Sequence, residues 1–385
     1  MSRSISVCSV AIAAICASTV LASAQVTSST TENDSLNPAT SPVAYVYVAN
    51  SLHGTTNQIT AYAAASNGAL TTIPGSPFKQ NVNWMAVNGA WLFGVANLDE
   101  DIYSFKIGSN GALSLKDKYT VVTNGDGVIS DYLDHTGSTL YADLYSTNND
   151  YLSYSINQSN GMITAIGDLP GGPANNSPVS FIGNNVFAYS SSCYQFGQEI
   201  VGVQRASNGT LSYISNFNAP FPAEKSGGFY CPWLAAADPT NHLAIAMEPL
   251  TSNWGQDGPW QLATYTAEAS GNLVTNSTYQ NMPSVLVGTV SDYWMSPNGK
   301  YLAVGGSNGL QIFHFNGANP ITKFTGLLTS SLINQIFWDN ANHVYAISQP
   351  GNKLFVYTVT SKGVTQAPGS PHTIERPQNL IVLPK

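Results

Sequence analysis

Two histidines and one arginine could take part in chemistry in this chain of few charges. Arg376 directly follows Glu375 and lies four residues after His372. Its guanidinium could anchor the carboxylate of a ligand beside His372, or it could be a solvated loop charge or a clasp between neighbouring segments. His53, in a loop between two apolar runs, could act as an acid or a base, or could be an ordinary surface histidine.

Aromatic residues gather in loop segments that could bind a flat ligand. Exposed Trp and Tyr rings stack on sugars and other rings, whereas buried rings fill the space between packed sheets. Three long segments, 168–178, 219–233 and 248–260, are rich in such residues or adjoin them. The candidates for ligand stacking are Tyr194, Trp233, Trp254 and Trp260. The sequence leaves stacking and packing both open.

The N-terminus has the layout of an export signal. Arg3 precedes an apolar run from Ile5 to Leu21, and Ala22-Ser23-Ala24 provides small residues for cleavage before Gln25. A single membrane anchor is the alternative, but the run is short for a spanning helix and ends in small and polar residues. We therefore expect a signal peptide over 1–24, no membrane span, and a secreted or periplasmic protein.

Export bears on the cysteines. Removing the signal removes Cys8 and Cys16 and leaves Cys193 and Cys231 in an oxidising compartment, where they are a candidate disulfide pair. No Cys-x-x-Cys pair and no Cys/His spacing resembles a zinc site. The sequence gives no sign of a metal site or a cofactor.

The charge balance limits the partners. The formal net charge is −8, and charged residues make up 9% of the chain. Nucleic acids and anionic membranes select clustered Lys and Arg, so we expect neither as a partner. A binding site for a phosphorylated sugar would also need several positively charged side chains. We expect a monomer that binds a small lactone or sugar, a glycan or a protein.

A repeat of short strands must position these residues. In its cleanest copy, alternating runs at 44–50 and 58–62 are followed by an Asn-Gly turn and a third run. Related turns recur along the chain, and the seven copies are Asn67-Gly68, Asn110-Gly111, Asn160-Gly161, Asn208-Gly209, Gly271-Asn272, Asn319-Pro320 and Lys362-Gly363. Their spacing is too long for the rungs of a β-solenoid, which is one alternative to a ring of sheets.

The repeat unit has four strands, and the chain end completes the first unit. Each later unit begins with an additional strand, as in 293–296 before the Pro297-Asn298-Gly299 turn. The first unit lacks it, and the orphan strand 378–383 can supply it. The sequence therefore predicts an all-β, seven-bladed β-propeller of four-stranded blades over 43–385, preceded by a disordered Ser/Thr-rich tether over 25–42. An open stack of sheets is the other alternative.

The repeat resembles the lactonase-type seven-bladed propellers, which include 6-phosphogluconolactonases and carboxymuconate-cyclising enzymes. The resemblance covers 43–385 and rests on Tyr47-Val-Ala-Asn50, Asn67-Gly-Ala-Leu-Thr71, Gly75-Ser-Pro-Phe78, Gly369-Ser-Pro-His372 and the closing run 379–384. These motifs are turns and strands that build any blade, so they are specific for the fold and much less so for activity.

The resemblance implies a catalytic glutamate at Glu248, because Ala244-Ile-Ala-Met-Glu248-Pro-Leu matches the family's Glu-Leu at the end of a second strand. Such a glutamate could be a general base that activates water, or could assist a ring-opening proton transfer, if burial tuned its pKa. The family's Pro-Arg-His stretch corresponds to Tyr230-Cys-Pro-Trp233, which has no cation. Arg205 is predicted on the opposite face of the ring, so Arg376 and His53 are the available helpers.

Two functions from different classes remain. The first is an exported propeller that binds a small molecule, glycan or protein and has a degenerate catalytic site. The second is an extracytoplasmic lactonase or cycloisomerase that acts on a sugar lactone or muconolactone, with Glu248 as general base. Low charge and long aromatic loops favour the binding protein.

Overall fold

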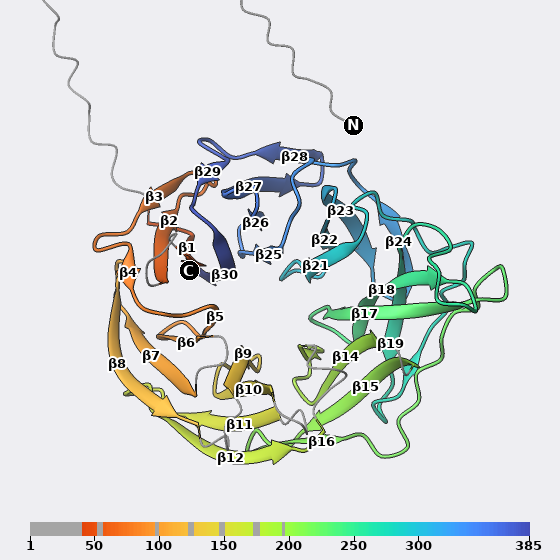
Figure 1. Ribbon diagram of the computed structural model, residues 1–385, viewed down its shortest axis with the longest axis horizontal. Coiled ribbons are helices and arrows are strands. Elements are labelled where there is room, and N and C mark those ends of the chain that lie inside the picture. The colour runs from red at the N-terminus through yellow and green to blue at the C-terminus, as the bar shows by residue number, and fades with distance from the viewer. Residues whose placement is uncertain are drawn as a thin grey trace, which may run out of the picture. The chain divides into compact units, whose positions relative to one another are not determined.

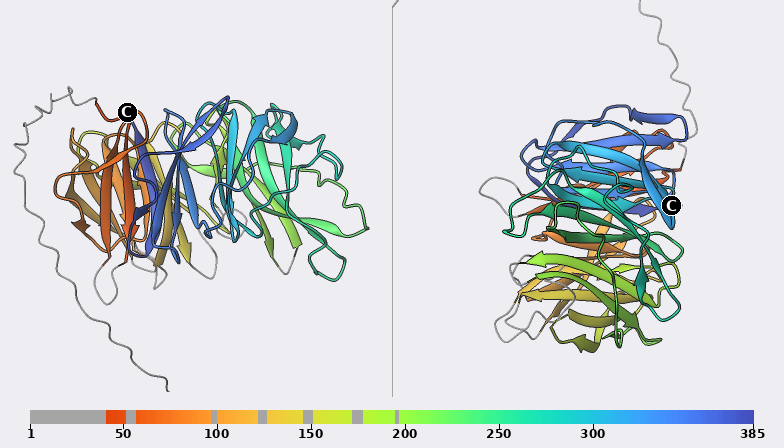
Figure 2. Two further views of the ribbon diagram at one scale, coloured as in Figure 1. Left: turned by 90° about the horizontal axis from the view of Figure 1, so that it is seen from above. Right: turned by 90° about the vertical axis from the view of Figure 1, so that its right-hand side faces the viewer.

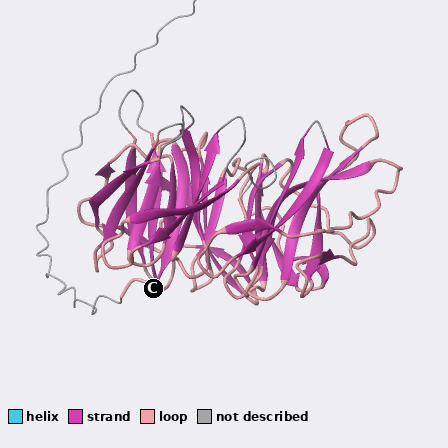
Figure 3. Cartoon of the chain, turned by 90° about the horizontal axis from the view of Figure 1, so that it is seen from below, coloured by secondary structure: helices cyan, strands magenta, loops and turns pink. Residues whose placement is uncertain are grey.

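The structure is a computed structural model, and it describes residues 41–51, 57–96, 100–121, 127–145, 151–171, 178–194 and 197–385. These residues form strands, turns and loops, and no helix occurs among them (Figure 3). The expected signal peptide, most of the tether and His53 lie outside the described residues. Export and the role of His53 therefore stay predictions.

Seven antiparallel sheets surround a common axis, as Figure 1 shows. This confirms the predicted seven-bladed β-propeller. Blades are numbered along the chain, and the strands of each are given from the axis outwards. Blade 1 contains β30 (Pro377–Pro384), β1 (Ala44–Asn50), β2 (Gln58–Ala64) and β3 (Leu70–Thr72). Blade 2 contains β5 (Trp84–Val87), β6 (Trp91–Val95), β7 (Asp101–Ile107) and β8 (Leu113–Thr120). Blade 3 contains β9 (Gly127–Leu133), β10 (Thr139–Tyr145), β11 (Tyr151–Ile156) and β12 (Ile163–Leu169).

The remaining four blades repeat the pattern. Blade 4 contains β13 (Ser180–Phe181), β14 (Phe187–Tyr194), β15 (Gly197–Arg205) and β16 (Leu211–Tyr213). Blade 5 contains β17 (Phe229–Ala237), β18 (His242–Leu250), β19 (Gln261–Ala267) and β20 (Leu273–Val274). Blade 6 contains β21 (Val290–Met295), β22 (Tyr301–Gly306), β23 (Gly309–Asn316) and β24 (Asn319–Lys323). Blade 7 contains β25 (Gln335–Trp338), β26 (His343–Ser348), β27 (Lys353–Thr360) and β28 (Gly363–Gln366). Two short strands, β4 (Phe78–Lys79) and β29 (His372–Thr373), pair with β2 and β27.

The last strand of the chain closes the ring. β30 pairs antiparallel with β1, with Ile381 opposite Tyr47 and Leu380 opposite Val48. Both strands are almost fully buried, so the closure removes two apolar edges from solvent at once. The orphan strand predicted from the sequence is therefore the innermost strand of blade 1.

Adjacent blades pack face to face through apolar side chains, which explains why the second strand of most blades is buried on both sides. Tyrosines on second strands also reach the third-to-fourth-strand turn of the next blade. Three of them donate a hydrogen bond of 2.8 Å from Oη to a glycine carbonyl: Tyr47 to Gly111, Tyr141 to Gly209 and Tyr189 to Gly271. Figure 2 shows from the side how the blades stand next to one another and how their connections emerge on two opposite faces.

The Asn-Gly turns need glycine for two reasons. Gly161 has a positive φ of 76°, a left-handed conformation that residues with a Cβ rarely adopt. A Cβ at this position would also lie 2.3 Å from the Trp91 ring of the preceding blade. The repeated turn is thus a contact between blades as well as a chain reversal.

Candidate functional site

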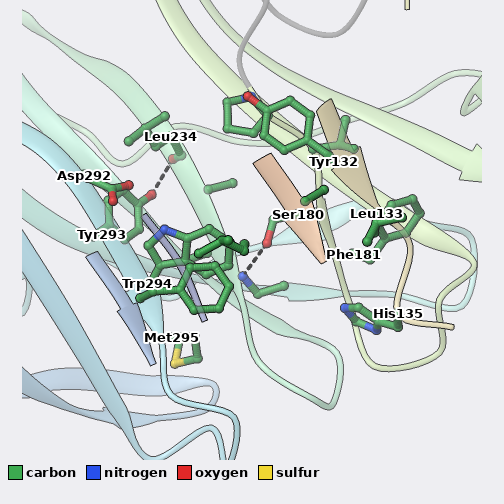
Figure 4. A pocket seen from close by; sticks show the side chains of 18 of the residues that line it. Tyr132, Leu133, His135, Ser180, Phe181, Leu234, Asp292, Tyr293, Trp294 and Met295 are labelled. Atoms are coloured by element: carbon green, nitrogen blue, oxygen red, sulfur yellow. Dashed lines mark hydrogen bonds between the residues drawn. The ribbon is translucent and has the colours of Figure 1, made fainter. Parts of the chain in front are cut away.

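The innermost strands of the blades enclose a cavity of about 520 Å³ along the axis of the ring. Figure 4 shows part of its wall. Residues of β5, β9, β13, β17, β21, β25 and β30 line it. The volume lies within the range of pockets that bind small organic ligands.

Aromatic rings form much of the cavity wall. Trp84 on β5 meets Tyr132 on β9 edge to face, with ring centroids 5.9 Å apart. Trp294 on β21 lies against Phe337 on β25 at 4.7 Å. Trp294 is 39% exposed, so a large part of its ring is free to contact a ligand. Flat faces of this kind bind sugars through their C–H surface and cations through the ring quadrupole.

Two carboxyl groups of blade 3 are buried without a counter-charge. Asp131 lines the cavity, is 1% exposed, and has no hydrogen bond from either oxygen to another residue. Asp143 lies on the next strand, β10, where its Oδ2 accepts a 3.5 Å hydrogen bond from Ser130 Oγ of β9. Its Oδ1 has no partner among the described residues. Burial raises the pKa of Asp131 well above its usual value and that of Asp143 to about 8. Asp143 is therefore mainly protonated at neutral pH, and burial shifts Asp131 in the same direction.

A third carboxyl group comes from blade 6. Asp292 Oδ2 accepts a hydrogen bond of 2.6 Å from the backbone N–H of Ile336, yet burial raises its pKa to about 7. Tyr132 lies in the same cavity on blade 3 (Figure 4). Its pKa is raised mainly by burial, with further increases from the charges of Asp143, Asp131 and Asp292. Acidic groups of blades 3 and 6 therefore influence the same phenol.

The other two aspartates of the cavity already have basic partners. Asp134 forms an ion pair of 2.8 Å with Arg205, and Asp238 lies 3.3 Å from His242 Nδ1. Each also accepts backbone N–H bonds in the turn between the first two strands of its blade. No Lys or Arg is present among the described residues that line the cavity. Asp131 and Asp292 thus remain without a cation.

Glu248 lies outside this cavity, near the end of β18. It is directly opposite Cys231 in the ladder between β17 and β18. Its side chain is partly buried, and burial raises its pKa. No hydrogen bond or ion pair joins its carboxylate to any described residue.

Exposed aromatic rings flank Glu248 on blade 5. Alternate residues of paired strands share one face of a ladder, so Phe229 and Trp233 of β17 lie on the same face as Glu248. Trp254 packs edge to face on Phe229 with centroids 4.9 Å apart. Trp233 is 37% exposed and Trp254 46%. Together, Phe229, Trp233, Glu248 and Trp254 are called the blade 5 strip below.

Cys193 and Cys231 form the expected disulfide, with Cα atoms 5.2 Å apart. The two cysteines lie within β14 and β17. The bridge therefore joins the second strand of blade 4 to the first strand of blade 5.

Arg376 and His372 lie on other blades than Glu248. Arg376 lies at the junction of blades 7 and 1, where its N–H donates to Asn352 Oδ1 at 2.8 Å and its carbonyl accepts from Ser51 N at 3.2 Å. Its side chain is exposed and forms no ion pair with the described residues. His372, on β29, packs against Tyr62 with ring centroids 6.0 Å apart, and burial lowers its pKa. Nothing is described of His53 or of the Tyr194 side chain.

Trp260 is a correction to the expected ligand-stacking set. It is 5% exposed and belongs to the core between blades 5 and 6, together with Leu262 and Val287. Its ring therefore fills the space between two sheets and offers no face to a ligand. Trp233 and Trp254 keep exposed faces, and their role in binding stays a prediction.

The sequence interpretation missed Asp131, Asp143 and Asp292. A signal did exist, because each interrupts an otherwise apolar or aromatic strand, as in Thr139-Leu-Tyr-Ala-Asp143-Leu-Tyr. A charged residue at a position of a strand that should be buried indicates a structural or functional role. Only the ring geometry shows which of these residues face the axis.

The described part of the chain contains neither a metal-binding cluster of side chains nor a membrane-spanning helix. No group of three or more His, Cys, Asp or Glu side chains there is arranged to hold a metal ion. No helix there is long and apolar enough to span a membrane.

Solved structures show the same fold at low sequence identity. A periplasmic gluconolactonase of Pseudomonas aeruginosa, PpgL, matches with a TM-score of 0.64 and 13% identity, over 88% of this chain and 99% of that one. A protein of Bacteroides fragilis proposed to be a 6-phosphogluconolactonase matches with a TM-score of 0.64 and 14% identity, over 88% and 98%. A protein of Lactobacillus plantarum matches with a TM-score of 0.60 and 13% identity, over 89% and 99%.

No protein-family model and no curated protein sequence matches the chain. At these identities the structural likeness shows the fold alone. The expected resemblance to the seven-bladed propellers of the 6-phosphogluconolactonase type is confirmed at that level.

Proposed function

We propose that this protein is an exported binding propeller with a lactonase-type fold, which binds a neutral lactone or sugar at the blade 5 strip and lacks a full catalytic set. The observation that carries the proposal is the isolation of Glu248. A lactonase needs groups that stabilise the negative charge of the opening ring, in addition to a base. Arg376, the one arginine expected to help, is fixed through its backbone at another junction of the ring.

The side chains of the blade 5 strip suit a neutral ligand that carries hydroxyl groups. Exposed rings of Trp233 and Trp254 offer flat apolar faces. The carboxylate of Glu248, on the same face of the strand pair as Trp233, can accept hydrogen bonds from hydroxyl groups. An anionic ligand would meet the Glu248 charge with no cation to offset it. This combination favours sugars and lactones over phosphosugars.

Export is the second part of the proposal. The N-terminal pattern of a charged residue, an apolar run and small residues supports it. The Cys193–Cys231 disulfide is compatible with an oxidising compartment. The structural likeness to a protein described as periplasmic is also compatible with it. Mass spectrometry of the protein purified from the medium or periplasm tests this part, because a mature N-terminus near Gln25 is expected.

The binding part is tested by titrating the mature protein with neutral monosaccharides, oligosaccharides and sugar lactones. Trp233→Ala and Trp254→Ala should each weaken binding roughly fivefold or more, because each removes a stacking face. Trp294→Ala is the matched control, since it removes an equally exposed tryptophan from the axial cavity. Equal loss in the control, or no binding of any sugar or lactone, would exclude the strip as the site.

A second candidate function is lactone hydrolysis or cycloisomerisation with Glu248 as base. The raised pKa of Glu248 favours it, because a carboxylate of higher basicity removes a proton more readily. A second acid or base would then have to come from His53 or from the substrate itself.

A further inference from the structure

The axial cavity carries an unbalanced set of charges that the proposed function does not use. Four aspartates line it, and no Lys or Arg does so among the described residues. Arg205 forms an ion pair with Asp134, and His242 Nδ1 lies 3.3 Å from Asp238. His135 also lines the cavity, and burial lowers the pKa of its imidazole below the usual value, which favours the neutral ring at neutral pH.

The other two aspartates, Asp131 and Asp292, have no basic side chain beside them among the described residues. Burying a carboxyl group without hydrogen bonds is unfavourable by a few kcal/mol, and proteins seldom leave such groups unmatched. Asp131 is 99% buried with both oxygens unpartnered. Asp292, on the other side of the axis, is bonded through the Ile336 N–H but has no cation near it. A positively charged ligand in the cavity would supply what both carboxyls lack.

The aromatic rings of the wall suit the same kind of ligand. The negative face of a tryptophan or tyrosine ring attracts a cation within about 6 Å of its centre. Trp294 offers the most exposed ring of the wall, and Tyr132 lies in the same cavity (Figure 4). Rings on several walls with carboxyls behind them form a common recognition pattern for alkylammonium groups.

We propose that the axial cavity binds a small organic ammonium ion, held between the rings of Trp294 and Tyr132 and balanced by Asp131 and Asp292. The cavity volume of about 520 Å³ accommodates a ligand of this size. A metal ion fits the site less well, because the described carboxyls do not converge as a set of three or more ligands. The inference is independent of the proposed sugar or lactone site on blade 5.

Binding of a cation must also release protons. A positive charge beside Asp292 and Asp131 lowers their pKa values, so carboxyls that are protonated in the free protein ionise on binding. The other titratable groups that line the cavity are Tyr132, Asp134 and His135 from blade 3, Asp238 from blade 5 and Tyr293 from blade 6. Behind the wall, Arg205 of blade 4 pairs with Asp134, and His242 of blade 5 lies beside Asp238. Because Asp292 titrates at about 7, affinity should rise as pH increases through neutrality.

The test compares two ligands of the same shape. Choline carries a quaternary ammonium group where 3,3-dimethyl-1-butanol carries a neutral tert-butyl group of the same shape. Isothermal titration calorimetry measures the affinity of the mature protein for each. Choline should bind at least about tenfold more tightly than the alcohol, with affinity about tenfold higher near pH 8 than near pH 6. Titrations in buffers of different ionisation enthalpy should show proton release for choline only.

Variants locate the site. Trp294→Ala should weaken choline binding roughly five- to thirtyfold, whereas Trp254→Ala, an exposed tryptophan on blade 5, should leave it unchanged. Asp131→Asn keeps the shape of a side chain that makes no hydrogen bonds, and should reduce both affinity and proton release. Thermal unfolding confirms that each variant is folded.

The opposite results overturn the proposal. Equal affinity for choline and its neutral analogue would show that the cavity responds to shape rather than charge. No binding of either ligand by the folded wild type, or equal loss in Trp294→Ala and Trp254→Ala, would equally refute it. Sugar binding that is lost in Trp233→Ala but is unaffected by choline would show that sugars bind on blade 5 and choline binds elsewhere. The two proposals can therefore fail independently.

Discussion

Glu248 and Cys231 are directly opposite one another in the ladder between β17 and β18. Directly opposite residues of an antiparallel pair have Cβ atoms about 5 Å apart. The carboxyl group that the sequence singled out therefore lies beside the disulfide to Cys193, on the strand pair that also carries the partly buried ring of Phe229 and the exposed ring of Trp233. The bridge thus fixes the strand that forms one side of the proposed ligand site.

The disulfide should contribute strongly to stability. It closes a loop with a sequence separation of 38 residues, for which restriction of the unfolded chain predicts roughly 3–4 kcal/mol. Replacing both cysteines by serine should lower the free energy of unfolding by up to that amount in urea denaturation. Reduction of the wild-type protein should give the same loss. A change within error in both experiments would show that the blades hold blade 5 in place without the bridge.

The tyrosine contacts between blades should each add a measurable amount. Tyr141→Phe removes a buried 2.8 Å hydrogen bond and leaves the Gly209 carbonyl without that donor, so it should destabilise the protein by about 1–2 kcal/mol. Tyr119→Phe is the control, because the Tyr119 hydroxyl has no hydrogen-bond partner among the described residues. Equal effects of the two substitutions in denaturant titrations would argue against a role of the tyrosine hydroxyls in joining blades.

Glycine in the repeated turn should be required for contact between blades. Gly161→Ala would place a Cβ 2.3 Å from the Trp91 ring and should destabilise the protein by on the order of 3 kcal/mol. Gly227→Ala separates the two causes, since Gly227 has a similar φ of 80° but no atom within 4 Å of the new Cβ. It should lose only about 1 kcal/mol. Equal losses would assign the whole effect to backbone strain.

Stability should fall as pH rises through neutrality. Burial raises the pKa of Asp143 to about 8 and that of Asp292 to about 7 in the folded protein, from a usual value of 3.8. The folded protein therefore binds these protons more tightly than the unfolded chain. The contribution of these two groups to the free energy of unfolding is fully present below about pH 4. It decreases as the pH rises toward about 8, by at most about 1.4 kcal/mol per pH unit for each carboxyl.

Thermal unfolding between about pH 5 and pH 8 checks this direction. Asp143→Asn should flatten the profile, because the amide cannot ionise. Since Glu248 also has a raised pKa, Glu248→Gln serves as a comparison for a carboxyl that is only partly buried. A wild-type profile that rises toward pH 8 would contradict the raised pKa values of the buried carboxyls.

The fold could be predicted from the sequence because each repeat unit contains recognisable turns and alternating strands within a short segment. Asn-Gly turns such as Asn110-Gly111 and alternating strands recur in each unit, and the unpaired final strand requires a partner in the first unit. The disulfide also followed, because it uses the two cysteines that remain once the signal is removed. These inferences need only spacing and strand direction.

The site was predicted less completely, because its geometry depends on which side of a strand faces the axis. Trp260 and Trp254 look alike in the sequence, yet one is 5% exposed in the core and the other 46% exposed on a loop. The carboxyls of Asp131 and Asp143 interrupt buried strands of blade 3, but this pattern does not show which of the two faces the axis. Such positions become visible only when the neighbouring blade is in place.

We propose that the protein binds sugars or lactones without opening a lactone ring, and a lactone-opening assay tests this most directly. Proton release should be measured over a panel of sugar lactones and muconolactones for the mature protein and its Glu248→Gln variant, both shown to be folded by thermal unfolding. The account predicts that neither protein opens any lactone faster than buffer, while the wild type binds sugars or lactones through Trp233 and Trp254. Turnover by the wild type that collapses in Glu248→Gln would contradict it and establish a lactonase with Glu248 as its base.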